Sequence, residues 1–233
     1  NIKESIDSFG MKKYNGEPLI MEYMTPSIYQ KIINVISYIY NKSAIDERID
    51  LFRFKDVLDS YSEGQWKSKM WAVEELEKHI TDKHNACLII GGWYGLFSHI
   101  LCDRGFKKQV KNIDIDPACK LIGKKMSSFN NISFITRDGL DIFFDEKTNY
   151  ANKIVVCTAC EHIDSEELYF ALGNKHENMI VCLQSNNYYE VNSHINCHDT
   201  VEHFIKSLPL KNILYSGTKT YKDDYDRFMV IGK

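Results

Sequence analysis

The sequence has no excess of basic charge and no apolar run long enough to cross a bilayer. Its 233 residues carry a formal net charge of -3 at pH 7, so nothing indicates the strongly basic face of a nucleic-acid-binding domain. No signal peptide is recognisable either. We therefore expect a cytoplasmic protein with no membrane partner, and we disfavour nucleic acid as a partner. The sequence carries no signal for an oligomeric state.

A disulfide framework is also absent from the pattern. The chain has 7 cysteines, an odd number, and several of them lie in strand-like apolar runs. Cys157 and Cys160 form a CxxC pair, but no second pair stands at zinc-finger spacing. We therefore expect reduced, buried thiols, as in a reducing cytoplasm.

Residues 1–85 are mainly helical in pattern and form the first of two predicted parts. Thr25-Pro26 predicts a helix start, because Thr is a good cap and Pro suits the first helical position. Residues 51–58 predict a shorter helix, and residues 66–80 predict a further amphipathic one. We expect this part to be a helical extension or lid.

From residue 86 to residue 233 the pattern changes to alternating strand-like and helix-like runs. Such alternation is typical of a mostly parallel sheet with helices on both faces. The last two strand-like runs are separated only by the polar, turn-rich residues 215–227, which predicts an antiparallel pair at a sheet edge. Expected strands are 86–90, 110–115, 132–136, 153–158, 179–184, 213–216 and 228–231, and expected helices are 96–103, 117–129, 166–172 and 200–207.

The predicted fold class is therefore α/β. We expect a Rossmann-like, doubly wound, mostly parallel seven-stranded sheet with an antiparallel last strand, preceded by an N-terminal helical segment.

The end of the first strand is the strongest local signal in the chain. Its apolar run passes directly into Gly91, Gly92 and Gly95. Glycine lets backbone N–H groups approach a ligand, and the following helix adds partial positive charge. About twenty residues later Asp114 ends the second strand, where a carboxylate suits the ribose hydroxyls of a nucleoside. Asp138 follows the third strand and could accept from an adenine amine.

In this order, these residues resemble the class I S-adenosylmethionine-dependent methyltransferase family over residues 86–233. The resemblance rests on residues 88–95, 113–117 and 136–139 and on the closing hairpin. It implies S-adenosylmethionine as cofactor, with Asp114 holding the ribose hydroxyls and Asp138 facing adenine. The cofactor-binding residues that it implies are Gly91, Gly92, Trp93, Tyr94, Gly95, Asp114, Ile115, Asp138, Gly139 and Thr158.

Two positions depart from that family's pattern. The family usually carries an acidic residue where Ile89 stands and a glycine where Trp93 stands. Tyr94, His162 or a polar residue of the N-terminal part would then hold the amino-acid end of the cofactor. The end of the fourth strand also lacks the Asp/Asn-Pro-Pro-Tyr/Phe and Pro-Cys motifs, which disfavours enzymes that methylate DNA bases.

Glu161 and His162 follow the fourth strand, where a general base would serve a protonated nucleophile. We predict both as catalytic residues, with the alternative that Glu161 caps or pairs and His162 packs. The polar residues 184–190 would orient a polar acceptor, unless they are a loop with Asn-mediated turns. The predicted substrate-binding residues are Gln65, Lys69, Cys160, Gln184, Asn186, Asn187 and Tyr188.

A metal site is weighed and not predicted. His194, Cys197 and His198 could join Glu161 or His162 as ligands, and the spacing of His194 and His198 would place both on one face of a helix. The residues around them are polar and loop-like instead. The prediction is therefore that no residue binds a metal.

The predicted function is an S-adenosylmethionine-dependent methyltransferase acting on a polar small-molecule or peptide-like acceptor. One alternative keeps the cofactor but transfers or cyclises its aminobutyrate chain, as nicotianamine-synthase-like enzymes do on a related fold with a helical N-terminal part. The other alternative is a non-catalytic binding protein of methyltransferase fold, which the departure at Ile89 motivates.

Overall fold

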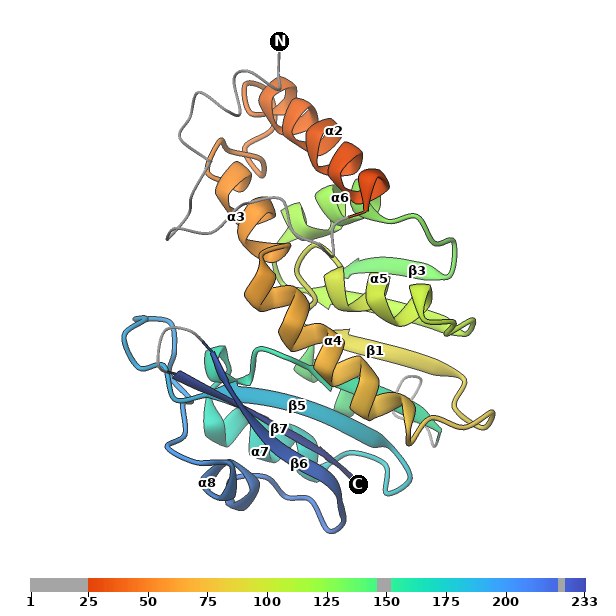
Figure 1. Cartoon of the computed structure of the whole chain (residues 1–233), viewed down its shortest axis with the longest axis vertical. Helices are drawn as coiled ribbons and strands as arrows, with labels where there is room; N and C mark the ends of the chain where they lie inside the picture. Colours follow the sequence, from red (N-terminus) through yellow and green to blue (C-terminus); the bar gives the residue numbers. More distant parts are fainter. Residues whose placement is uncertain (1–24, 146–151, 222–224) are drawn as a thin grey trace. The chain divides into compact units, whose positions relative to one another are not determined.

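The computed structural model describes residues 25–145, 152–221 and 225–233 (Figure 1). The chain divides into two compact units, residues 1–66 and residues 67–233. The boundary falls inside helix α4 (Glu63–Glu77), earlier than the composition change at residue 85. The predicted division into residues 1–85 and 86–233 stays a prediction.

The N-terminal unit contains α2 (Pro26–Lys42) and α3 (Arg53–Ser60). α2 begins at the predicted cap, because the Thr25 hydroxyl accepts a hydrogen bond from the backbone N–H of Ile28 at 3.3 Å. Its buried residues recur at three- and four-residue spacing, which places them on one face of the helix. They are Ile28, Ile32, Val35 and Ile39.

The larger unit is built on one seven-stranded sheet with strand order β3-β2-β1-β4-β5-β7-β6. β7 runs antiparallel to both of its neighbours, and the other neighbouring strands pair in parallel. This confirms the predicted mostly parallel sheet with an antiparallel last strand. The strands are β1 (Ala86–Ile90), β2 (Gln109–Asp114), β3 (Ile132–Thr136), β4 (Lys153–Cys157), β5 (Ile180–Asn186), β6 (Ile213–Tyr221) and β7 (Tyr225–Gly232).

Helices connect the parallel strands, and most of them start at side-chain caps. Asp116, Asp164 and Thr200 each accept hydrogen bonds from backbone N–H groups of the helix that follows. The helices of this unit are α5 (Leu96–Asp103), α6 (Pro117–Met126), α7 (Ser165–Gly173) and α8 (Val201–Lys206), with 3-10 turns η1 (Leu140–Phe143) and η2 (Cys160–His162).

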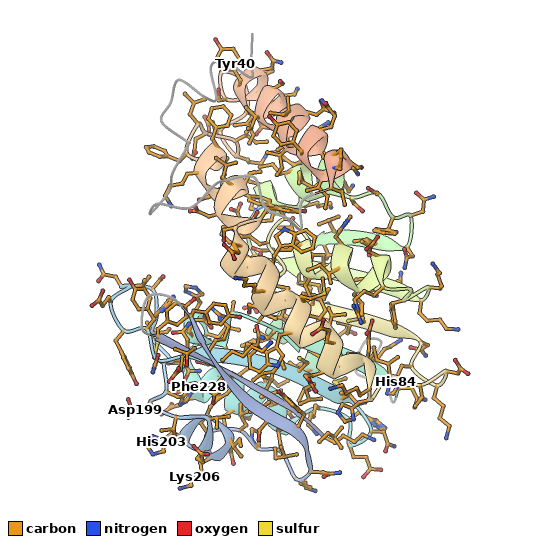
Figure 2. The ribbon with its side chains drawn as sticks, in the orientation of Figure 1. Tyr40, His84, Asp199, His203, Lys206 and Phe228 are labelled. Atoms are coloured by element: carbon orange, nitrogen blue, oxygen red, sulfur yellow. The ribbon has the colours of Figure 1, made fainter. Side chains whose placement is uncertain are left out.

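One face of the sheet packs on η1, α7 and α8. Leu88 and Ile90 of β1 point to this face and join Leu168 of α7 and Phe204 of α8 in one buried cluster. Phe228 of β7 belongs to the same cluster, whereas Asp199, His203 and Lys206 project outward in Figure 2. Because side chains alternate along a strand, Cys87 and Ile89 point to the opposite face.

The sheet edge at β5, β7 and β6 is longer than the apolar pattern predicts. β6 and β7 extend to Tyr221 and Tyr225, so residues placed in a turn-rich segment are paired strands instead. β5 likewise continues to Asn186, which pairs with Arg227 of β7. Apolar runs mark only the buried middle of these strands. Backbone pairing carries them further through polar residues.

Candidate active site

The loop after β1 is held in an unusual backbone conformation. Gly91 and Gly95 have φ of 61° and 91°, and Trp93 between them has φ of 48°. The left-handed conformation is unfavourable by about 1 kcal/mol or more for a residue that has a Cβ atom. Two hydrogen bonds from β2 hold Trp93 there: its N–H donates to Asp114 Oδ2 at 2.9 Å, and its carbonyl accepts from Asn112 Nδ2 at 3.0 Å.

Asn112 is the residue under this loop that the sequence analysis missed. Its side chain is 1% exposed and also accepts a hydrogen bond from the Ser98 hydroxyl of α5 at 2.9 Å. A Cβ at Gly92 would lie 2.2 Å from Asn112 Oδ1, so the loop passes over Asn112 only because Gly92 has no side chain. β2 carries Gln109, Lys111 and Asp114 as well, so the sequence pattern alone did not single out Asn112.

Asp114 stands at the end of β2, where the prediction put the ribose-binding carboxylate. Its Oδ1 accepts from the backbone N–H of Asp116 at 3.0 Å, and its Oδ2 accepts from Trp93 as described. The two oxygens of a carboxylate have about four acceptor positions, so both keep capacity for further donors. The neighbouring Ile115 is 71% exposed, which places an apolar surface beside this carboxylate.

The loop after β3 packs against the end of β1. A Cβ at Gly139 would lie 2.4 Å from Ile90 Cγ2, so the backbone of Gly139 packs directly on the Ile90 side chain. Asp138 is exposed, and its Oδ1 accepts from the backbone N–H of Leu140 at 2.9 Å. Asp138 therefore lies at the same sheet edge as the loop after β1.

The end of β4 holds a buried ion pair. Glu161 is 3% exposed, and its Oε1 accepts from Arg227 Nη2 at 3.3 Å and from Asn186 Nδ2 at 2.8 Å. Arg227 Nη1 donates to the carbonyl of Thr158 at 3.1 Å. Burial and, to a lesser extent, the charge of Arg227 lower the pKa of Lys69, and the charge of Glu161 opposes them, so that the pKa is about 7. Sequence analysis missed Arg227, although a lone arginine entering an apolar strand was visible.

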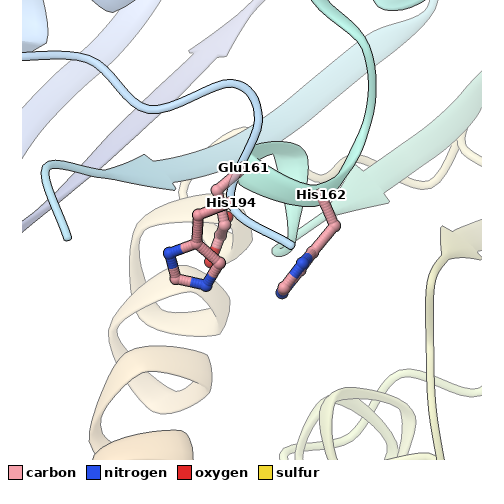
Figure 3. A group of neighbouring side chains, drawn as sticks. All are labelled: Glu161, His162 and His194. Atoms are coloured by element: carbon pink, nitrogen blue, oxygen red, sulfur yellow. The ribbon is translucent and has the colours of Figure 1, made fainter. Parts of the chain in front are cut away.

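His162 and His194 lie beside Glu161 (Figure 3). Their ring centroids are 4.7 Å apart, and the rings meet edge to face. The loop that carries His194 is pinned to the end of β4, because the N–H groups of Ile195 and Asn196 donate to the Glu161 carbonyl at 2.8 and 3.1 Å. The structure thus brings together the two predicted catalytic residues and a histidine 32 positions later in the chain.

The structure places the predicted substrate residues in different surroundings. Asn187 and Tyr188 are half-buried beside this cluster, and the Tyr188 ring packs on His194 at 6.1 Å. Asn186 is buried and orients Glu161, as described. Gln65 belongs to the N-terminal unit, and its role stays a prediction.

Cys160 and Gln184 are enclosed in the protein, and the proposed acceptor site does not include them. The Cys160 thiol is 0% exposed and donates to the carbonyl of Cys157, and burial raises its pKa. Gln184 is 0% exposed and is hydrogen-bonded to the hydroxyl and carbonyl of Ser68. Gln184 lies in the expected strand, but β5 continues past it to Asn186, so it points into a packed face of the sheet and not into an open loop.

Among the described residues, no helix is both long enough and apolar enough to cross a bilayer.

No family model matches the sequence, and no curated protein matches it. Solved structures do match. N-methyltransferase NodS from Bradyrhizobium japonicum aligns with a TM-score of 0.55 and 14% identity, over 74% of this chain and 97% of that chain. The magnesium protoporphyrin IX methyltransferase ChlM from Synechocystis aligns with a TM-score of 0.55 and 14% identity, over 76% of this chain and 86% of that chain. The chain has the class I methyltransferase fold.

A third comparison reaches beyond the methyltransferase-fold unit. A mutant of MtNAS aligns with a TM-score of 0.52 and 12% identity, over 99% of this chain and 74% of that chain. This likeness, like the other two, is one of fold.

Proposed function

We propose that the chain is an S-adenosylmethionine-dependent methyltransferase acting on a polar small-molecule or peptide-like acceptor. The observation that carries this proposal is the Asp114 carboxylate, which fixes the strained loop at Trp93 and keeps acceptor capacity at the end of β2. ChlM was solved with bound S-adenosylhomocysteine, which supports the same cofactor for this fold.

The residues at the ends of β1 to β3 fit a nucleoside of this kind. Gly91 is exposed, and a Cβ there would approach nothing closer than Ala159 Cβ at 3.9 Å, so its backbone is open. Asp114 would hold the ribose hydroxyls, Ile115 would lie against the adenine ring, and Asp138 would accept from the adenine amine. When bound, the cofactor supplies an electrophilic methyl group on a sulfonium.

The residues after β4 and β5 would receive the acceptor. Transfer of a methyl group from a sulfonium to the acceptor depends mainly on alignment, and a base is needed only where the nucleophile carries a proton. Glu161 is held by Arg227 and Asn186, so it acts from a fixed position. His162 is exposed, and its ring together with Glu161 would hold a proton or a cation of the acceptor.

Calorimetry with S-adenosylmethionine and S-adenosylhomocysteine tests the proposal. We expect both to bind the full chain, and Asp114→Ala to weaken binding about 100-fold or more, because hydrogen bonds to a charged group are each worth about 1.5–3 kcal/mol. Asp82→Ala is the matched control, since this aspartate is exposed and precedes β1 at the other edge of the sheet. No binding by the wild type, or equal binding by the Asp114 variant, would overturn it.

The bulk of Trp93 motivates a second measurement on the same cofactor. Mass analysis of the nucleoside product distinguishes the two transfer reactions. S-adenosylhomocysteine would support methyl transfer, whereas methylthioadenosine would show that the aminobutyrate chain is transferred or cyclised instead.

A further inference from the structure

We propose that Glu161, His162 and His194 bind a divalent transition-metal ion. These three residues, here called the Glu161 cluster, each offer one ligand atom, and the three atoms lie within 4.8 Å of one another. Binding of the ion does not depend on the cofactor. Only its role in catalysis rests on the proposed function.

The two histidines present the correct ring atoms for a metal. His162 Nδ1 lies 3.0 Å from the carbonyl oxygen of Ser193, and His194 Nδ1 lies 2.6 Å from the carbonyl oxygen of Tyr188. A carbonyl can only accept, so each Nδ1 carries the proton and each Nε2 keeps its lone pair. A hydrogen bond from the second ring nitrogen to a backbone carbonyl is the usual way in which metal-binding histidines are oriented.

Glu161 contributes an oxygen that the protein itself does not use. Oε1 accepts both hydrogen bonds, from Arg227 and Asn186. Oε2 is buried and has no hydrogen-bond partner among the described residues. An unpaired buried carboxylate oxygen is unfavourable, and a cation beside it would relieve this.

The geometry needs a small adjustment to close around an ion. Metal–nitrogen and metal–oxygen bonds of zinc are about 2.0–2.2 Å long, so the three ligand atoms must move closer together. His162 is exposed and can make that movement, whereas Glu161 is buried and the His194 loop is pinned to its carbonyl. The adjustable ligand is therefore the one at the surface.

The charges of the site select the kind of ion. Arg227 neutralises much of the charge of Glu161, so two imidazoles provide most of the attraction. Imidazole suits zinc, iron, nickel and copper, whereas calcium and magnesium prefer several oxygen ligands. Three protein ligands leave positions open for an oxygen or nitrogen atom of the acceptor.

Cys197 and His198, which were weighed as ligands from the sequence, lie outside the Glu161 cluster. The Cys197 thiol donates to Asn186 Oδ1 and to the Tyr188 carbonyl, and the His198 ring packs on Phe204 with 5.0 Å between centroids. From the sequence, a metal site was expected only if His194 and His198 shared one face of a helix. The backbone instead brings His194 to His162 through a loop.

Calorimetry of the full chain with zinc chloride, and separately with magnesium chloride, tests this inference. We expect one zinc ion per chain and no comparable magnesium binding. His162→Ala and His194→Ala should each weaken zinc binding about 100-fold or more, because even second-shell changes weaken binding 10- to 100-fold. His203→Ala, which removes an exposed histidine of α8, should leave it unchanged. Equal binding by all variants, or no zinc binding by the wild type, would overturn the inference.

The absorption spectrum of bound cobalt identifies the ligands directly and does not depend on the affinity. Cobalt held by two histidines and a carboxylate lacks the thiolate charge-transfer band that coordination by Cys197 would produce, so a band of that kind contradicts the assignment. Circular dichroism shows whether each variant folds, and the two histidine variants keep the buried ion pair. S-adenosylhomocysteine binding without zinc binding overturns the metal site alone, and the reverse result overturns the proposed cofactor alone.

Discussion

At the carboxyl edge of the sheet, hydrogen bonds tie the loop after β1 to the end of β2, whereas the Glu161 cluster keeps a buried oxygen unpaired among the described residues. The first region, here called the clamp, comprises the loop at Trp93 with Asn112 and Asp114. Hydrogen bonds from Asn112 and Asp114 stabilise the strained backbone of Trp93. In the second region, Arg227 and Asn186 bind Glu161 Oε1, and Oε2 keeps its lone pairs for a ligand. On our proposals, the clamp would bind the nucleoside without rearrangement, and the cluster would be completed by the metal ion.

The largest expected effect comes from opening the buried ion pair behind the cluster. Arg227→Met leaves Glu161 buried without its cation, and we expect the free energy of unfolding to fall by about 3–5 kcal/mol. Urea unfolding measures it. The double variant Arg227→Met with Glu161→Gln should recover part of the lost free energy of unfolding, because the carboxylate that lost its partner is then replaced by a neutral amide. A loss below about 1 kcal/mol for Arg227→Met would contradict this account of the cluster.

A substitution at Gly92 tests whether the clamp is preformed. A Cβ there would meet Asn112, which is fixed by Ser98 and Trp93, so Gly92→Ala should lower the free energy of unfolding by about 1–3 kcal/mol. It should also weaken S-adenosylhomocysteine binding. The control is Gly173→Ala at the end of α7, where a Cβ meets nothing within 4 Å and the helix should gain up to about 1 kcal/mol. Equal effects of the two substitutions in urea unfolding would exclude the close approach of Asn112.

The smallest effect concerns the strain at Trp93. Trp93→Gly and Trp93→Ala both remove the ring, but only glycine adopts the left-handed conformation without penalty. We expect the glycine variant to be more stable than the alanine variant by about 1 kcal/mol in thermal or urea unfolding. An alanine variant as stable as the glycine variant would show that the clamp holds no strain there.

The sequence predicts the sheet and, to within one residue, the ends of β1, β2, β3 and β4, because most of these buried parallel strands are apolar runs that end in polar residues. Asp114, Asp138 and Glu161 all stand where such runs stop. It does not predict Asn112 or Arg227, whose roles depend on neighbouring strands that pair across long stretches of chain. The continuation of β5 beyond Gln184 to Asn186 was not predicted for the same reason, since it depends on pairing with β7.

The Glu161 cluster shows a further limit of sequence patterns. His162 and His194 are far apart in the chain, and no periodic spacing relates them. They meet because the backbone of residues 195 and 196 bonds to the Glu161 carbonyl. A contact of this kind follows from the path of a loop, which residue types alone do not specify.

A crystal structure of the full chain with S-adenosylhomocysteine tests the central claim most directly. The account predicts ribose hydroxyls within hydrogen-bond distance of Asp114, adenine against Ile115, and the sulfur on the side of His162. A nucleoside bound away from Asp114, with the loop at Trp93 unchanged, would contradict it.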